Sequence, residues 1–228
     1  MTRSETIRFL ILRSIGNFLV LFAIFGVFAT FGPALYYEAL YRIVQIRDVT
    51  YSVADTVLAD NASFKDKIGF ADVLAGAKEQ VLVPVDTEFG IFIGKIGANA
   101  KVYPNVDPSD PNKFLPFLRT GVAHAKGTVF PGQKGNIYLF AHSTDNFWNV
   151  GRYNALFYLI KDIKAGDEVV IFFNNKRHNY TVSGSRVVNA EDVSFITKAQ
   201  GGEEQLILQT CWPPGTTWKR LLVFAEPR

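Results

Sequence analysis

The pattern of apolar and polar positions divides the chain into one long apolar run and a later region of short apolar segments. No charged residue occurs between Arg13 and Glu38, and 17 of the 24 residues from Ser14 to Tyr37 are hydrophobic. As an α-helix at 1.5 Å per residue this run is about 36 Å long, enough to cross a hydrocarbon core of roughly 30 Å. We therefore predict a transmembrane helix over residues 14–37, preceded by a short tail at residues 1–13.

Two other interpretations of the apolar run fit it less well than a membrane anchor. The apolar region of a cleavable signal peptide is about 7 to 15 residues long, which is shorter than this run. A buried helix of a soluble protein would have a polar face, but Leu, Val, Ile and Phe are found all around this one. We therefore expect the helix to stay in the bilayer.

The basic residues beside the predicted span indicate its orientation. Arg3, Arg8 and Arg13 precede it, whereas Arg42 and Arg47 follow it. Because cytoplasmic flanks carry the excess of Lys and Arg, the N-terminus is expected in the cytoplasm and the rest of the chain outside it. The protein is thus predicted to be a single-pass protein of the cell membrane.

After the predicted span the composition of the sequence changes twice. Residues 38–85 are mixed and polar, without a sustained strand pattern, and are interpreted as a stalk or spacer with possible helices at Val44–Leu58 and Ile68–Val83. From Asp86 onward, short apolar runs alternate with Gly, Pro, Asn and Asp, which is typical of strands and turns. Residues 86–228 are therefore expected to form one domain.

The runs in this domain predict a mainly antiparallel β structure. The expected strands are Phe89–Ile96, Asn136–Ala141, Glu168–Phe173, His178–Val188, Gln205–Thr210 and Arg220–Ala225. Only Tyr153–Ile160 has a firm helical pattern. Since closure removes exposed strand edges, we predict a closed or nearly closed antiparallel β-barrel with short helices.

Composition excludes several classes of function. The 24 Lys and Arg nearly balance the 21 Asp and Glu, giving a net charge of +3, so the chain lacks the basic excess that binding of nucleic acid requires. The one cysteine and three widely spaced histidines do not form a pattern of metal ligands. We predict no nucleic-acid partner, no metal and no cofactor.

Cys211 is the first candidate for chemistry. It follows the apolar run Gln205–Thr210 and precedes Trp212-Pro213-Pro214-Gly215, so a strand ending at this turn would place it at the rim of the sheet. The alternative is a buried structural cysteine. A free thiol outside the cytoplasm is exposed to oxidation, however, and its presence at a strand end favours a function.

Arg220 and His142 are candidates to act with this thiol. Arg220 begins the strand that follows the turn, so a hairpin would bring it close to Cys211, where its guanidinium could donate to an oxyanion. His142 ends another predicted strand, and Cys with His is the minimum for acyl transfer through a thioester. Each residue alone is more often an ordinary surface or loop residue, and the sequence does not show that His142 reaches Cys211.

Together these segments resemble a known family. The string from Leu208 to Gly215, followed by Arg220-Leu221-Leu222-Val223, is similar to the Thr-Cys-x-Pro and strand-initial Arg signature of sortases. The stretch from Gly121 to His142 is similar to the segment around their catalytic histidine, and residues 86–228 carry these motifs in the family's order. Ile207 and Ala141 depart from the commonest pattern, which bears on the subclass. The resemblance is closer to the class D and E types.

The resemblance implies a sortase-type β-barrel and a role for each candidate. Cys211 would be the nucleophile, His142 the general acid and base, and Arg220 the stabiliser of the oxyanion, while Thr210 and Trp212 are expected to contact the substrate. The implied reaction is transpeptidation at a C-terminal LPxTG-like sorting motif. Its partners would be secreted proteins with that signal and an amine acceptor on a peptidoglycan precursor or a pilin, with residues 14–37 in the bilayer of a bacterial surface.

Other interpretations remain open beside this one. The chain could be a thiol endopeptidase that hydrolyses the same motif, or an inactive barrel that binds peptides as a scaffold. His124 is interpreted as a supporting residue and His178 as a solvated one. The two acidic pairs Glu191-Asp192 and Glu203-Glu204 do not reach the six to eight oxygen ligands that calcium takes.

Overall fold

The computed structural model describes residues 3–47, 49–53, 79–143, 157–214 and 216–228. The contacts of the chain separate two compact units, residues 1–39 and residues 40–228. A single helix, α1 (Arg3–Ile46), forms the first unit and continues into the second.

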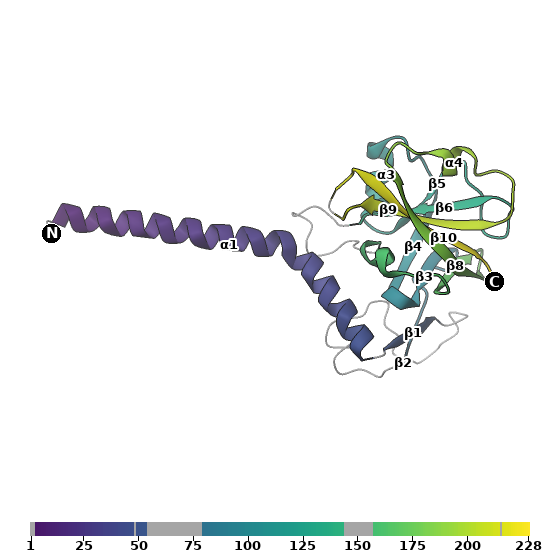
Figure 1. Ribbon diagram of the computed structural model, residues 1–228, viewed down its shortest axis with the longest axis horizontal. Coiled ribbons are helices and arrows are strands. Elements are labelled where there is room, and N and C mark those ends of the chain that lie inside the picture. The colour runs from purple at the N-terminus through teal and green to yellow at the C-terminus, as the bar shows by residue number, and fades with distance from the viewer. Residues whose placement is uncertain (1–2, 48, 54–78, 144–156, 215) are drawn as a thin grey trace. The chain divides into compact units, whose positions relative to one another are not determined.

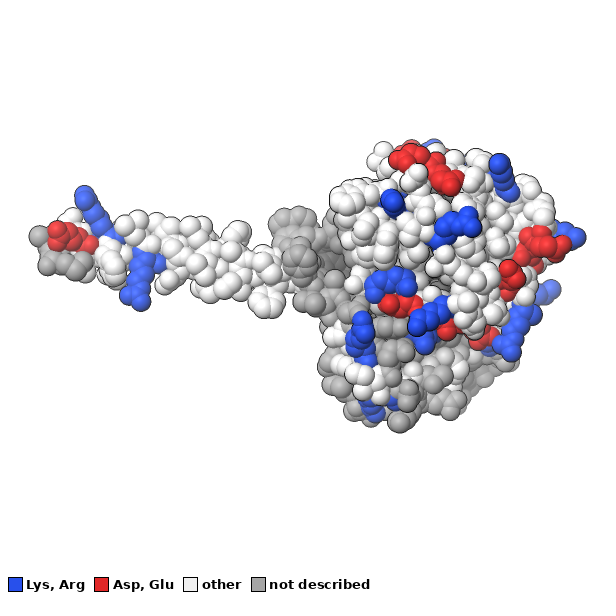
Figure 2. Space-filling model, in the orientation of Figure 1, with Lys and Arg blue, Asp and Glu red and all other residues white. Residues whose placement is uncertain are grey.

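The first unit is an apolar helix whose side chains face outward. Within α1, Arg3–Ala29 is long and apolar enough to cross a membrane, with a mean hydropathy of 2.1. Phe18, Phe22 and Phe25 are more than half exposed, as expected for side chains that pack against lipid. Figure 2 shows charged side chains near the N-terminal end of α1, followed by a stretch without charged side chains. This helix is compatible with a single-pass membrane anchor.

The second unit contains an eight-stranded closed barrel (Figure 1). Its strands are β3 (Phe89–Ile93), β4 (Ala98–Val106), β5 (Val122–Ala125), β6 (Asn136–Phe140), β7 (Glu168–Phe173), β8 (Lys176–Asn189), β9 (Gln205–Trp212) and β10 (Lys219–Pro227). Around the barrel the order is β10-β8-β7-β3-β4-β5-β6-β9, and β9 pairs with β10 to close it. The fold is mainly β, as predicted.

Two pairings in the barrel are parallel. The strands β4 and β5 run parallel, and so do β6 and β9, while all other neighbouring barrel strands are antiparallel. Parallel strands end at the same edge of a sheet, so the C-terminal ends of β6 and β9 lie side by side. This pairing brings together segments about 70 residues apart in sequence, namely Phe140 and Gln209.

The interior of the barrel is filled by alternate residues of the strands. Leu206 and Leu208 of β9, with Ile137 and Leu139 of β6, are completely buried in this core, and the inward residues of the other strands complete it. Because side chains alternate along a strand, Ile207 and Gln209 lie on the outer face of β9. The position of each candidate side chain follows from this alternation.

The short helices connect strands. They are α3 (Pro111–Leu118), α4 (Ser194–Thr197) and the 3₁₀ helices η1 (Gly94–Ile96) and η3 (Tyr158–Asp162). Asp110 caps the N-terminus of α3, because its side chain accepts the backbone N–H of Asn112 at 3.0 Å. Pro111, the first residue of the helix, has no backbone N–H that would need a partner. Aromatic and aliphatic residues of α3 and α4 cover the outer faces of β6, β9 and β10.

The six predicted strands are confirmed, with shifts at their ends. The strands β4 and β5 and the helix α3 were not expected. The sequences of β4 and α3 contain polar residues and a proline inside the element, and β5 is only four residues long. The expected helix at Tyr153–Ile160 falls partly on residues 151–156, which lie outside the described residues, and Tyr158–Asp162 is a 3₁₀ helix.

Of the two helices expected between α1 and the barrel, the part of the chain that the structure describes is helical only at residues 44–46, where α1 ends. Thr50–Val53 forms β1 and Glu79–Leu82 forms β2, and the two strands pair in parallel. Residues 54–78 lie outside the described residues. Backbone pairing between distant segments, which local sequence does not encode, explains this difference.

The segment after the helix packs against the outside of the barrel. Tyr51 and Val53 of β1 form a buried cluster with Phe92 of β3 and with Val170 and Phe172 of β7. The strand β7 is therefore covered on both faces, which accounts for its continuous apolar run from Val169 to Phe173. The described part of the expected spacer is thus joined to the folded domain by an apolar contact.

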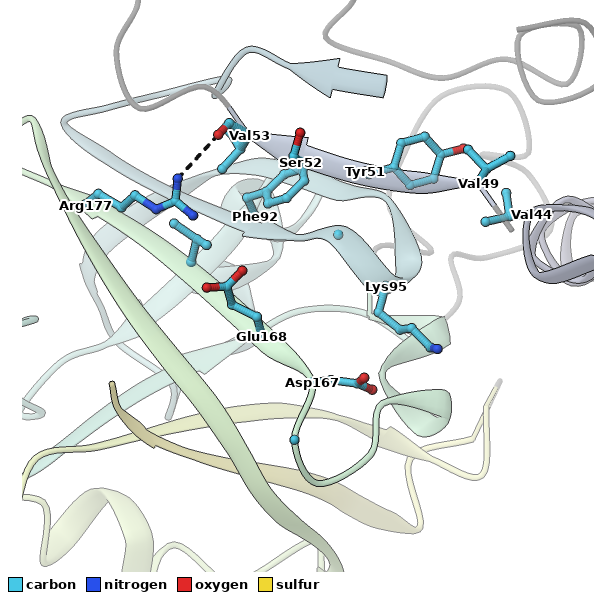
Figure 3. Close-up of a pocket in the computed structure, with 13 residues that line it drawn as sticks. Val44, Val49, Tyr51, Ser52, Val53, Phe92, Lys95, Asp167, Glu168 and Arg177 are labelled. Atoms are coloured by element: carbon cyan, nitrogen blue, oxygen red, sulfur yellow. Dashed lines mark hydrogen bonds between the residues drawn. The ribbon is translucent and has the colours of Figure 1, made fainter. Parts of the chain in front are cut away.

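Beside this contact lies a cavity of about 580 Å³. Figure 3 shows Tyr51, Ser52 and Val53 along one wall, and Lys95, Asp167 and Glu168 on the other. Nη1 of Arg177 donates to the carbonyl oxygen of Val53 at 3.4 Å. None of the residues that line this cavity is a candidate for the chemistry predicted above.

Candidate active site

The strands β9 and β10 form the hairpin that the sequence predicts around Cys211. Their register pairs Arg220 with Cys211 and Lys219 with Trp212. Residues paired directly across an antiparallel sheet have Cβ atoms about 4.5 to 5.5 Å apart, and their side chains lie on the same face. Cys211 is half-buried and carries a free thiol. The predicted proximity of Cys211 and Arg220 is therefore confirmed.

His142 follows the strand that lies on the other side of β9. The last paired residues of β6 and β9 are Phe140 and Gln209. The alignment continues beyond them, because the N–H of Ala141 donates to the carbonyl of Gln209 at 3.2 Å. His142 follows Ala141, and Cys211 follows Thr210. The fold thus brings His142 to the edge of the sheet at which Cys211 lies.

Thr210 links the end of β9 to the segment that follows β6. Its Oγ1 donates to the carbonyl oxygen of Ala141 at 3.2 Å, and the side chain is almost completely buried. The residue before Cys211 is therefore tied to the residue before His142. A buried hydrogen bond of this kind holds two strand ends in one arrangement, because breaking it leaves a buried polar group without a partner.

The predicted residues divide between the two faces of β9. By alternation Cys211 lies on the outer face with Gln209, while Thr210 and Trp212 lie on the other face. Trp212 packs against the core cluster of the barrel interior. Thr210 and Trp212, which we expected to contact the substrate, are therefore not on the face of Cys211, whereas Trp218 in the hairpin loop is 75% exposed.

The guanidinium of Arg220 is held by the hairpin loop. Its Nη1 donates to the carbonyl oxygens of Thr217 at 2.9 Å and Lys219 at 3.0 Å. Among the described residues, Nε and Nη2 of Arg220 have no hydrogen-bond acceptor. These donors are available to an oxygen atom beside Cys211, which is the role that an arginine needs in order to stabilise an oxyanion.

The surroundings of His124 indicate a structural role. It lies in β5 with none of its surface exposed. Asn105 N–H donates to its Nδ1 at 3.3 Å, so Nε2 carries the proton and lies 3.0 Å from the carbonyl oxygen of Val129. Burial lowers the pKa of this imidazole, opposed by the hydrogen bond to Val129. These contacts agree with the interpretation of His124 as a supporting residue.

His178 belongs to β8 and is half-buried, so the expectation of a solvated residue near a turn holds only in part. The acidic pair Glu203-Glu204 contributes a structural contact, since Glu204 Oε1 accepts the Tyr180 hydroxyl at 2.6 Å and the N–H of Gly132 at 2.9 Å. Within the described ranges, no three His, Cys, Asp or Glu side chains lie where they could together hold a metal ion.

Two residues near Cys211 were not singled out from the sequence. The Tyr138 hydroxyl of β6 donates to Oε1 of Gln209 at 2.8 Å, on the outer face that Cys211 shares. Gln209 is the one polar residue between Ile207 and Cys211 on that face of β9, and the alternation of the strand could have indicated it. Tyr138 could not have been found, because it reaches Gln209 only through the parallel pairing of β6 with β9.

Comparisons with known proteins agree with this arrangement. A sequence model of the sortase domain matches residues 91–228. Sortase D of Bacillus subtilis is 27% identical over 137 residues, which cover 59% of this chain and 60% of that protein. The chain therefore spans less than two thirds of the length of this relative.

Solved structures share the fold. Sortase C-1 from Actinomyces oris matches with a TM-score of 0.50 at 24% identity, over 63% of this chain and 75% of that chain. A lid mutant of sortase A from Corynebacterium diphtheriae matches with a TM-score of 0.51 at 20% identity, over 86% of this chain and 95% of that chain. Because the sortase domain model matches more than half of the chain, we conclude that this protein belongs to the sortase family.

Proposed function

We propose that this protein is a membrane-anchored cysteine transpeptidase, closest to the class D and E types, that acts on a C-terminal LPxTG-like sorting motif. The observation that carries the proposal is the direct pairing of Cys211 with Arg220 inside the region that matches the sortase domain. The parallel pairing of β6 with β9 adds His142 at the same edge.

In the proposed reaction Cys211 gives its thiol proton to His142, and the resulting thiolate attacks the carbonyl carbon of the scissile peptide bond. The carbonyl oxygen becomes an oxyanion, which accepts hydrogen bonds from the free donors of Arg220. His142 gives a proton to the leaving amine as the C–N bond breaks, and a thioester forms on Cys211. An amine nucleophile then attacks the thioester and loses a proton to His142. As the new amide bond forms and the C–S bond breaks, His142 returns this proton to the sulfur and regenerates the thiol.

The anchor supports this function. A substrate that is itself tethered in the membrane meets an enzyme confined to the same surface at a raised effective concentration. The proposed substrates are secreted proteins with the sorting signal, and the proposed acceptor is an amine on a peptidoglycan precursor or a pilin. The proposed location is the cell membrane, with residues 1–13 cytoplasmic, residues 14–37 in the bilayer and residues 38–228, including the catalytic domain from about residue 86, outside.

The proposal is tested with the full-length chain in detergent micelles. A labelled LPxTG peptide is incubated with and without an added amine, and the products are separated by chromatography and identified by mass. We expect a ligated product that requires both the amine and Cys211. A hydrolysed product that the amine does not change would instead show a thiol endopeptidase, and equal product from a Cys211→Ala variant would overturn the assignment of the nucleophile.

A further inference from the structure

On the outer face that carries Cys211, Gln209 lies among buried apolar side chains. Phe140 of β6, Ile207 of β9 and Leu222 of β10 lie on this face and are buried under its covering elements. Between them, Gln209 is half-buried and lies beside Tyr138. A polar pair in an apolar surface requires hydrogen-bond partners, because each unpaired buried polar group costs free energy.

Tyr138 fixes the orientation of the Gln209 amide. The tyrosine is 2% exposed, and burial raises the pKa of its hydroxyl well above the ordinary value, opposed by the nearby Arg220. The hydroxyl therefore keeps its proton, and it donates this proton to Oε1 of Gln209 at 2.8 Å. With Oε1 directed at Tyr138, the amide nitrogen Nε2 is directed away from it.

Nε2 of Gln209 has no acceptor among the residues that the structure describes. Gln209 lies two residues before Cys211 on the same face of β9, which at about 3.3 Å per residue is a separation of about 7 Å. An extended peptide bound at Cys211 has the same rise per residue. A residue about two positions from the scissile bond would reach Gln209 in a peptide that lies along β9.

We infer that Gln209, oriented by Tyr138, is a specificity-determining residue that selects a peptide side chain with an oxygen acceptor about two residues from the scissile bond. The inference rests on the proposed transpeptidase function and extends it to substrate choice. An aliphatic side chain at that position would leave Nε2 of Gln209 without a partner when the peptide covers it. A site that donates a hydrogen bond discriminates against analogues that lack the acceptor.

The test compares peptides that differ in one side chain. Each position of a sorting peptide on either side of the scissile bond carries Asn or Leu in turn, since these side chains are similar in size but only Asn offers an oxygen. For the full-length chain in detergent micelles, kcat/KM is expected to favour Asn at one position, about two residues from the scissile bond, by about tenfold. The Gln209→Leu variant is expected to lose this preference at that position only.

Two further variants keep the test decisive if Gln209→Leu does not fold. Gln209→Glu keeps an acceptor for Tyr138 but removes the amide donors, so it should also lose the preference for Asn. Tyr138→Phe removes the orienting hydrogen bond and should reduce the preference by a smaller factor. Gln205→Leu is the matched control, because Gln205 lies on the same face of β9 but about 20 Å from Cys211 along the strand, and this variant should keep the preference.

The inference is overturned if Gln209→Leu keeps the parent's preference, or if it lowers kcat/KM equally for all peptides, which would indicate a structural role or a contact with the peptide backbone. These outcomes leave the proposed function intact. Absence of any Cys211-dependent cleavage by the parent chain would refute the proposed function itself, and the inference with it.

Discussion

Arg220 and Cys211 are direct cross-strand partners on β10 and β9, and the guanidinium of Arg220 is held in place by the carbonyl oxygens of Thr217 and Lys219. The arginine is therefore both adjacent to the thiol and restrained by its own loop. A restrained donor needs little rearrangement to meet the charge that develops during the reaction. This relationship makes Arg220 a sharp test of the proposed mechanism.

We predict that Arg220→Lys lowers kcat with a sorting peptide by about 100- to 1,000-fold, because a compact ammonium cannot contact the loop carbonyls and an oxyanion with one planar group. The matched control is Arg186→Lys on β8, an exposed residue opposite Leu222 of β10. Steady-state kinetics of both variants check the prediction. Equal activity of Arg220→Lys and the parent would remove Arg220 from the mechanism.

Thr210 is expected to act as a positioning residue. A Thr210→Val change keeps the shape of the side chain but removes the hydrogen bond to the carbonyl of Ala141. Losing a buried hydrogen bond costs about 1 to 3 kcal/mol, so we expect a lower melting temperature and a reduced kcat with little change in KM. Thr210→Ser, which keeps the hydroxyl, should restore kcat. The prediction is wrong if the valine variant lowers the melting temperature but keeps the parent's kcat.

His124 is predicted to govern stability and not catalysis. Because burial lowers its folded pKa below the ordinary 6.5, the unfolded chain binds the proton more readily than the folded chain does. The contribution of the neutral imidazole to the free energy of unfolding is fully present above pH 6.5. It declines as the pH falls from 6.5 through the lower pKa of the folded state. Thermal unfolding of the parent should therefore show a loss of stability below pH 6.5.

In the His124→Phe variant this part of the pH dependence should be absent, while stability at pH 7.5 falls because Asn105 N–H and the Val129 carbonyl lose their partner. The variant should retain turnover, whereas His142→Gln should abolish it. A catalytic role for His124 would instead appear as loss of turnover in a variant that is still folded.

The strand β1 is predicted to be part of the stable domain. A chain truncated to residues 86–228 would expose the outer sides of Phe92, Val170 and Phe172, which β1 and its neighbours bury. Each such side chain contributes about 1.5 to 3 kcal/mol when buried. We expect this chain to melt at a lower temperature than residues 40–228 and to bind a hydrophobic dye, whereas removal of residues 1–39 alone should not change the melting temperature. Equal melting temperatures of the two truncated chains would show that the contact is dispensable.

Much of the barrel follows from local sequence. The strand β7 was predicted at its observed bounds, because its apolar run is continuous and turn residues flank it. The hairpin of Cys211 and Arg220 was also predictable, since a single turn joins its strands. In contrast, β4 contains Lys101, Pro104 and Asn105, and it is a strand only because it pairs with β3 and β5. Pairing partners override such local preferences.

The sequence indicated Cys211, Arg220 and His142 as candidates, but it did not show how the fold brings His142 to Cys211. His142 approaches β9 through a parallel pairing, which needs a long connection that the sequence pattern does not specify. The same pairing brings Tyr138 to Gln209. The resemblance implied that Thr210 and Trp212 contact the substrate, but neighbours along a strand lie on opposite faces, so both lie on the face opposite Cys211. The alternation rule applied to β9 places Gln209, two residues before Cys211, on the face of Cys211.

The most direct test of the proposed mechanism is the intact mass of the full-length protein after mixing with a sorting peptide in the absence of any amine. We predict an adduct with the mass of the acyl fragment on the parent chain, stable in acid and discharged by an added amine as ligated peptide. The Cys211→Ala variant should show no adduct. An adduct that persists in this variant, or turnover by the parent with the adduct located on another residue, would contradict the proposal that Cys211 is the nucleophile.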